Sequence, residues 1–149
     1  METRQPPLST INLDRFLTAQ EDAYSSALHE LRAGRKQGHW MWFIFPQIDG
    51  LGHSSTARFY AIKSLDEAAA YLAHPVLGPR LIECCEALLL HPDRSARDIL
   101  GSPDDLKLRS CATLFSRIQP GHPVFGRILD AFFPDGSDSR TLERLRIND

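Results

Sequence analysis

The residue types that could do chemistry gather first between Gly34 and Ser55, in the segment GRKQGHWMWFIFPQIDGLGHSS. A glycine-containing loop that is followed by serines and enters a helix can present backbone N–H groups and hydroxyls to an anion such as phosphate. Lysine and histidine side chains can add positive charge, and the ring of Trp40 or Trp42 can stack on a base or a sugar. The candidate ligand-binding residues of this segment are Lys36, His39, Trp40, Gln47, Gly50, Gly52 and Ser54.

A second candidate segment is DDLKLRSCATLF, which begins at Asp104 and is predicted to form a helix. Lys107 and Ser110 are three residues apart and share one stripe of that helix, so we expect both to face a ligand. No general base is evident beside Ser110, which argues against a nucleophilic serine. His39 is the candidate catalytic residue, because an imidazole can transfer a proton near neutral pH. The sequence leaves open whether the protein is an enzyme.

Each of these features also has a purely structural explanation. The aromatic residues can fill a core, Gly50 and Gly52 can form a turn, and Ser54 can cap a helix. The polar residues of the second segment can form an exposed helix face with ion pairs between residues three apart. Both explanations stay open at the level of the sequence.

Histidines, cysteines and carboxylates give no indication of a metal or cofactor site. The six histidines form no HxxxH or HExxH pair, and three of them directly precede proline. Cys84, Cys85 and Cys111 are an odd number without CxxC spacing, which argues against a disulfide framework and against zinc. The acidic residues mostly lie at predicted helix starts, where the helix dipole explains them. We therefore expect no metal and no cofactor.

Length and charge indicate the class of protein. A chain of 149 residues corresponds to about one domain, and its 42% hydrophobic and 24% charged residues are typical of a globular protein. The net charge of −2 provides no overall positive field, so we expect no binding to nucleic acid or to a membrane. The first ten residues, METRQPPLST, lack the apolar stretch of a signal peptide, and we expect a cytoplasmic protein. The oligomeric state stays open.

The spacing of apolar residues predicts an all-α fold, with residues 1–11 as a flexible tail and residues 12–149 as a single compact helical domain. The uniformly apolar run at 41–45 predicts one short extended segment, although a buried helical turn fits the same pattern. Helices with both ends predicted cover residues 12–33, 55–62, 64–73, 95–100, 103–118 and 123–133. Two further helices are predicted to begin at residue 75 and at residue 138 or 139.

Capping residues set the expected ends of these helices. Asn12 is the expected N-cap of the first helix, and Gly34 is expected to end it. Ser64 and Glu67 predict a capping box. Ser102 is the expected cap of the helix that carries the second candidate segment.

Four stretches carry a family resemblance: FxxAQ at residues 16–20, the run at 34–54, YLAHPVLGPRL, and ILGSPDDLKLRSCATLF. Together they resemble a bacterial and fungal family of domains of unknown function, over residues 12–145. The resemblance implies an all-α fold for an intracellular protein of unestablished activity. Some members carry the label calpastatin, but that inhibitor is a disordered chain, whereas capped amphipathic helices here predict a substantial core.

The distal half is also similar in layout to a second family, one linked to ADP-ribose and to N-glycoside intermediates of riboflavin metabolism. In HPVLGPRLIECCEALL followed by SARDILGSPDDLKLRSCATLF, a helix leads into a short acidic turn and then a final helix, as in that family. The similarity is one of layout and not of motif.

Two functions follow from these observations. The first is binding or processing of a small phosphate-bearing ligand, such as a nucleotide sugar or an ADP-ribose-like molecule, in a pocket between HWMWFIFPQ and DDLKLRS. Lys36 and Lys107 would meet its charge, and Trp40 would stack on it. The second is a noncatalytic protein-interaction or scaffold domain without a ligand, in which the aromatic segment is core.

Overall fold

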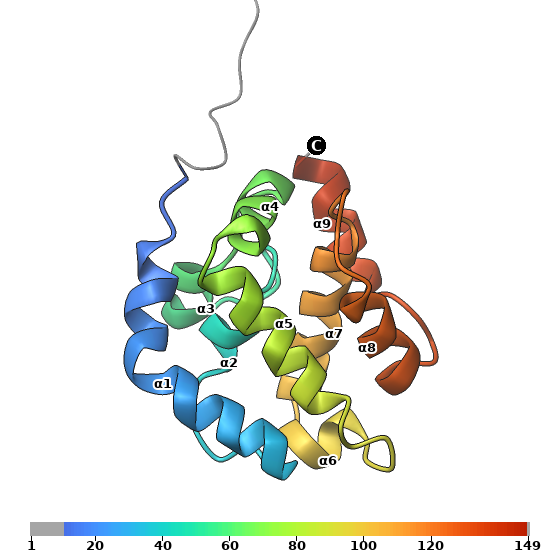
Figure 1. Ribbon diagram of the computed structural model, residues 1–149. Coiled ribbons are helices and arrows are strands. Elements are labelled where there is room, and N and C mark those ends of the chain that lie inside the picture. Colours follow the sequence, from blue (N-terminus) through green and yellow to red (C-terminus); the bar gives the residue numbers. More distant parts are fainter. Residues whose placement is uncertain (1–10, 149) are drawn as a thin grey trace, which may run out of the picture.

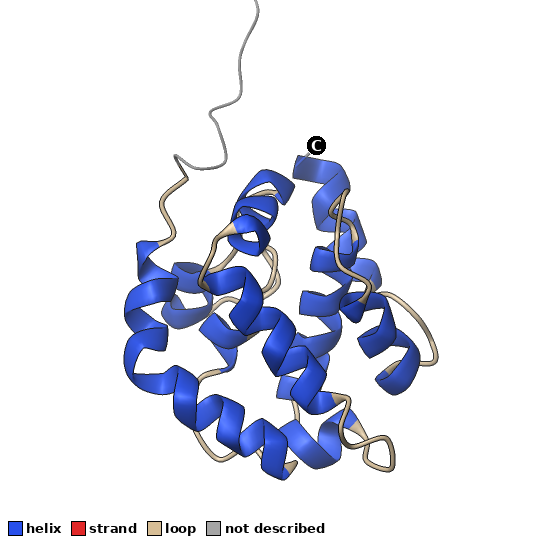
Figure 2. Cartoon of the chain, viewed as in Figure 1, coloured by secondary structure: helices blue, strands red, loops and turns tan. Residues whose placement is uncertain are grey.

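The computed structural model describes residues 11–148, with side chains described as far as Arg146. This part of the chain forms nine α-helices and no strand, which confirms the predicted all-α fold (Figure 2). The predicted tail lies outside the described residues except for Ile11. The helices are α1 Asp14–Ala33, α2 Met41–Ile44, α3 Ser55–Tyr60, α4 Leu65–Ala73, α5 Leu77–Leu88, α6 Ala96–Leu100, α7 Asp104–Ser116, α8 Val124–Phe132 and α9 Ser139–Asn148.

Two central helices organise the fold. α5 packs against α1, α4 and α8, while α7 packs against α4, α6, α8 and α9. In Figure 1, α5 crosses the middle of the molecule between α1 on one side and the α8–α9 pair on the other. The short helix α2 packs against α1 and α3, which places the tryptophan segment beside the first helix. None of the described helices is long and apolar enough to cross a membrane.

The first helix forms as its apolar spacing predicts. Phe16, Ala27 and Leu31 are fully buried on one face. Gly34 ends the helix in the left-handed conformation, with φ of +81°, and its N–H returns to the carbonyl of Leu31. The predicted cap is wrong by one residue, because Leu13 and not Asn12 occupies the N-cap position and the helix begins at Asp14. The predicted cap, Asn12, instead accepts the N–H of Asp14 at 2.8 Å.

The apolar run at 41–45 is not an extended segment. Residues 41–44 form the short helix α2, in which Met41 and Ile44, one turn apart, are buried while Trp42 and Phe43 are partly exposed. This helical spacing could not be recognised in the sequence, because all five residues at 41–45 are apolar. The extended piece lies further on, where an isolated bridge pairs Ile48 with Ile62.

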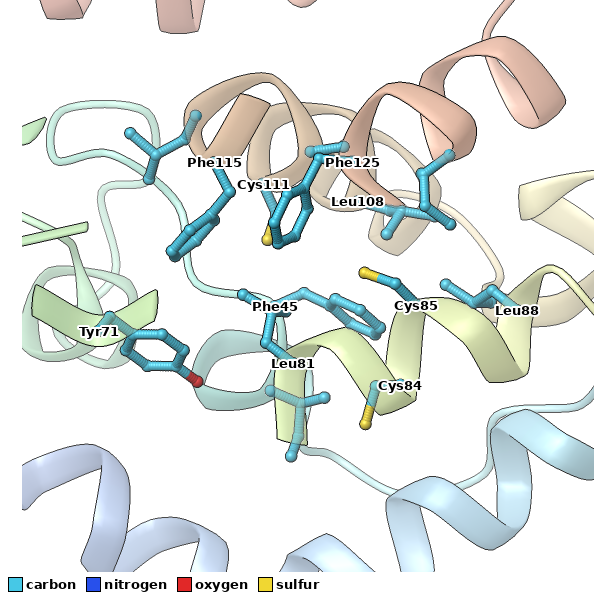
Figure 3. Packing of buried hydrophobic residues seen from close by; sticks show 14 of the residues in the cluster. Phe45, Tyr71, Leu81, Cys84, Cys85, Leu88, Leu108, Cys111, Phe115 and Phe125 are labelled. Atoms are coloured by element: carbon cyan, nitrogen blue, oxygen red, sulfur yellow. The ribbon is translucent and has the colours of Figure 1, made fainter. Parts of the chain in front are cut away.

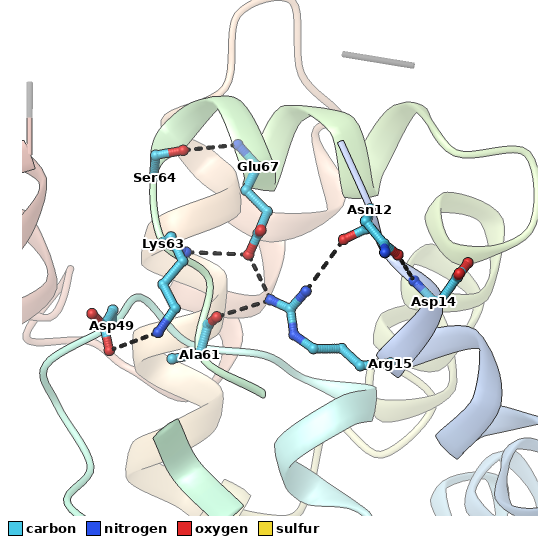
Figure 4. A network of polar contacts seen from close by, with 8 residues as sticks. All are labelled: Asn12, Asp14, Arg15, Asp49, Ala61, Lys63, Ser64 and Glu67. Carbon is cyan, nitrogen blue, oxygen red and sulfur yellow. Dashed lines mark hydrogen bonds and ion pairs between the residues drawn. The ribbon is translucent and has the colours of Figure 1, made fainter. Parts of the chain in front are cut away.

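Only half of the predicted capping box at the start of α4 forms. The hydroxyl of Ser64 accepts the N–H of Glu67 at 3.1 Å. The carboxylate of Glu67 does not return to Ser64 but accepts from Arg15 at 2.7 Å and from the N–H of Lys63 at 3.2 Å (Figure 4). Because Arg15 lies in α1, this carboxylate joins the first helix to the fourth.

A complete capping box is found instead at α6. Ser95 accepts the N–H of Asp98 at 3.0 Å, and the Asp98 carboxylate accepts the N–H of Ser95 at 3.3 Å. The predicted cap at Ser102 is wrong, because Pro103 occupies the N-cap position and the helix begins at Asp104.

The core takes buried residues from most of the helices, and Figure 3 shows the part of it in which side chains of α5 and α7 face each other. The rings of Phe115 and Phe125 stack with centroids 5.4 Å apart, and Tyr71 packs 5.6 Å from Phe115. All three cysteines are buried free thiols, and burial raises the pKa of Cys84 to about 12. The thiols therefore stay protonated at neutral pH and pack as small apolar side chains.

Candidate functional site

The two candidate segments meet at the carboxylate of Asp104. Its Oδ2 lies 3.0 Å from the ammonium of Lys36, and its Oδ1 lies 3.1 Å from that of Lys107. Lys36 Nζ also lies 5.2 Å from the ring centroid of Trp40. Lys107 Nζ lies 4.8 Å from that of Trp42, and a cation within about 6 Å of a ring centroid is attracted to its face. We call these five residues the lysine–tryptophan cluster.

The two lysines of the cluster differ in how firmly they are held. The Lys36 side chain is 10% exposed, and its ammonium also donates to the carbonyl of Gly38 at 2.5 Å. The N–H of Lys36 donates to the carbonyl of Ile99 at 2.8 Å, which ties the segment to α6. The Lys107 side chain is 24% exposed, and within the described chain its ammonium is paired with Asp104 alone. Lys107 is therefore the more accessible of the two lysines.

The two tryptophans have different surroundings. Trp40 is 2% exposed, and its indole N–H donates to the carboxylate of Glu30 at 3.0 Å. Stacking of a ligand on Trp40 does not fit this position, because the ring is enclosed in the core. Trp42 is the second residue of α2, is partly exposed, and presents its ring to Lys107.

Trp42 also lines a small cavity with three of the predicted residues: Gln47, Gly50 and Gly52. The cavity has a volume of about 10 Å³, which is room for about one water molecule. It lies between α2, the glycine loop and α3 rather than between the tryptophan segment and α7. A nucleotide does not fit inside it, so this cavity is not the ligand-sized pocket that the sequence predicted.

Close packing explains the two glycines of the loop. Gly50 has φ of +96°, and a Cβ there would lie 2.4 Å from the guanidinium of Arg144. Arg144 in turn donates to the carbonyl of Asp49 at 3.1 Å, so α9 holds the loop. A Cβ at Gly52 would lie 2.6 Å from the Cβ of Ala57. The structure therefore supports the explanation of these glycines as a turn.

The two predicted serines make internal hydrogen bonds. Ser54 caps α3 by accepting the N–H of Ala57 at 3.0 Å. Ser110 is buried, and its hydroxyl lies 3.3 Å from the carboxylate of Asp138, the residue before α9. Ser110 therefore lies at the α7–α9 contact, whereas the ammonium of Lys107 lies beside Asp104 and Trp42.

Acid–base groups around the cluster come from two neighbouring segments. His39 is exposed on the stretch that joins Lys36 to Trp40. Asp105 directly follows Asp104, and its buried Oδ1 accepts no hydrogen bond from the described residues. Over residues 11–148, no group of three or more histidine, cysteine or acidic residues could hold a metal ion.

Glu30 also belongs to this region, although it lies outside both candidate segments of the sequence. Its Oε1 accepts from the N–H groups of Gln37 and Gly38 at 2.6 and 2.7 Å, as well as from Trp40. Burial alone would raise the pKa of Glu30, but these hydrogen bonds and the Lys36 ammonium outweigh it, and the pKa is lowered. The sequence does contain an indication of this role. Glu30 lies in the last turn of α1, where a carboxylate interacts unfavourably with the helix dipole unless other groups stabilise its charge.

Comparisons with known proteins identify the family. A family model described as "Protein of unknown function (DUF1810)" matches residues 10–145. The chain belongs to the DUF1810 family. A crystal structure of the conserved hypothetical protein Rv1873 from Mycobacterium tuberculosis is similar to this DUF1810 chain, with 50% identity and a TM-score of 0.87 over 90% of this chain and 96% of that one. No curated protein matches, and neither the family model nor the similar crystal structure supports the calpastatin label.

Proposed function

We propose that this domain binds a small phosphate-bearing ligand, such as a nucleotide sugar or an ADP-ribose-like molecule, at the lysine–tryptophan cluster. The observation that carries the proposal is the position of Trp42. Its ring lies under the ammonium of Lys107, and the same ring lines the cavity formed with Gln47, Gly50 and Gly52. An aromatic face beside a lysine offers a stacking surface for a base and a positive charge for a phosphate.

The accessible groups define how such a ligand would sit. The ammonium of Lys107 has three N–H donors, and the carboxylate of Asp104 uses one of them. The ligand contacts the exposed part of Trp42 beside Lys107, because the cavity on the other side of the loop has room for about one water molecule. His39, exposed on the same segment, is the group that we propose for any proton transfer to the bound ligand.

Asp104 is the group against which a phosphate must compete. Its carboxylate holds both ammonium groups of the cluster, so an incoming anion takes over at least one of these ion pairs. The diphosphate of such a ligand as a whole carries more negative charge and more acceptor oxygens than one carboxylate does, which allows the exchange. Asp104 therefore sets the affinity, and ligands with a single weak charge are disfavoured.

A thermal-shift assay tests the proposal with Lys107→Ala. Saturation of the wild-type protein with ADP-ribose or pyrophosphate at 100 times the dissociation constant is expected to add about 2.7 kcal/mol, or roughly 5–10 °C for a domain of this size. Lys107→Ala is expected to weaken binding roughly 10-fold to 100-fold, since it removes one charged hydrogen bond.

Arg127→Ala provides the matched control, because it removes one positive charge from the exposed face of α8. This variant is expected to bind as the wild type does. If no phosphate-bearing probe shifts the wild-type melting temperature, the proposal is wrong, and the noncatalytic interaction domain becomes the better account.

A further inference from the structure

The carboxylate of Glu30 accepts three hydrogen bonds from the segment between Lys36 and Trp40. Glu30 Oε1 accepts the N–H of Gln37 at 2.6 Å, the N–H of Gly38 at 2.7 Å and the indole N–H of Trp40 at 3.0 Å. Hydrogen bonds to an ionised acceptor are roughly twice as strong as neutral ones. Three such bonds from five consecutive residues define the path of the segment.

The segment closes tightly around this carboxylate. A Cβ at Gly38 would lie 2.8 Å from Trp40 Cδ1 and 3.4 Å from Glu30 Oε2, so Gly38 packs directly against both. The ammonium of Lys36 donates to the carbonyl of Gly38. Gly38 is thus held through its N–H by Glu30 and through its carbonyl by Lys36. The position of the Lys36 ammonium therefore depends on where Glu30 holds Gly38.

The end of α1 gives Glu30 a fixed position. Arg94 donates to the carbonyl of Gly34 at 2.6 Å, and the ring of His91 lies 2.8 Å from the carbonyl oxygen of Leu31. These two residues follow α5, and they hold the last turn of α1 from outside the helix. A side chain that rises from such a packed helix positions a neighbouring segment better than one from a loop does.

We propose that Glu30 is a positioning residue of the site: its carboxylate fixes the segment from Lys36 to Trp40, and so places the Lys36 ammonium and the His39 imidazole for a phosphate-bearing ligand. The effect on the ligand rests on the proposed function, whereas the fixing of the segment does not. Glu30 acts through the segment and touches no ligand itself.

Glu30→Gln tests this role, because glutamine keeps the length of the side chain and one acceptor oxygen but removes the charge. The chain has two tryptophans and therefore gives two indole N–H signals in a nitrogen-15 NMR spectrum. In Glu30→Gln, the Trp40 signal is expected to move, and its N–H to exchange with solvent about tenfold faster. The Trp42 signal is expected to change little. Glu21→Gln, which alters an exposed residue of the same helix, is expected to change neither signal.

A titration with pyrophosphate and with ADP-ribose completes the experiment. Glu30→Gln is expected to bind about tenfold more weakly than the wild type, and Glu21→Gln equally well. An unchanged Trp40 signal in Glu30→Gln overturns the positioning role. A displaced Trp40 signal with wild-type affinity overturns its link to the ligand. If the wild type binds neither probe, the proposed function fails, and the Trp40 signal still decides whether Glu30 fixes the segment.

Discussion

Gly78→Ala is expected to destabilise the protein by about 3 kcal/mol or more, with a fall in melting temperature of roughly 6–12 °C. Gly78 lies in the first turn of α5, where a Cβ would come 2.0 Å from the carbonyl oxygen of Leu72 in α4. That neighbour is backbone, so the clash is relieved only by moving two helices apart. Urea unfolding followed by circular dichroism measures the loss.

Gly126→Ala is the matched control for this substitution. Gly126 lies within α8, and no heavy atom lies within 4 Å of the place where its Cβ would be. Alanine is expected to stabilise the protein here by about 0.5–1 kcal/mol, because glycine loses more conformational freedom in a helix. Equal effects of the two substitutions would contradict the close contact between α4 and α5.

Asp104→Asn is expected to strengthen the binding of a phosphate-bearing ligand, by on the order of 30-fold, while it lowers stability by about 1–2 kcal/mol. The stability falls because the ammonium groups of Lys36 and Lys107 lose their shared counter-ion. The affinity rises because those ammonium groups no longer have to be taken from a carboxylate. Isothermal titration calorimetry with ADP-ribose and thermal unfolding measure the two effects separately.

Asp130→Asn removes a charge from the exposed face of α8 and serves as the control. It is expected to leave both affinity and stability close to the wild-type values. A parallel fall of affinity and stability in Asp104→Asn would contradict the competition between Asp104 and the ligand, because it would show that the carboxylate supports binding.

The helical fold was predictable because local signals decide it. The apolar spacing of α1, its end at Gly34 and the cap at Ser64 depend on residues within a few positions of one another. The form of residues 41–45 was not predictable, since five apolar residues in a row fit a buried strand and a buried helical turn equally well. Tertiary contacts settled it.

The meeting of the two candidate segments was predictable, but the roles within it were not. Sequence patterns placed Lys36 and Lys107 in one site, and the structure brings both to Asp104. They did not show which tryptophan faces the core, because residues two apart share a face of a strand but lie on nearly opposite faces of a helix, and the apolar run fits both. Asp104 was explained by the helix dipole and by ion pairs between residues three apart, which agrees with its pairing to Lys107, but its pairing with Lys36 was not predicted.

The most direct test of a ligand at the lysine–tryptophan cluster is the Trp42 indole signal in a nitrogen-15 NMR titration with ADP-ribose. Binding at the exposed part of Trp42 beside Lys107 predicts that the Trp42 signal moves in a saturable way. It is expected to move further than the signal of Trp40, whose ring is enclosed in the core. Saturable binding with the Trp42 signal unmoved would place the ligand elsewhere and contradict the account.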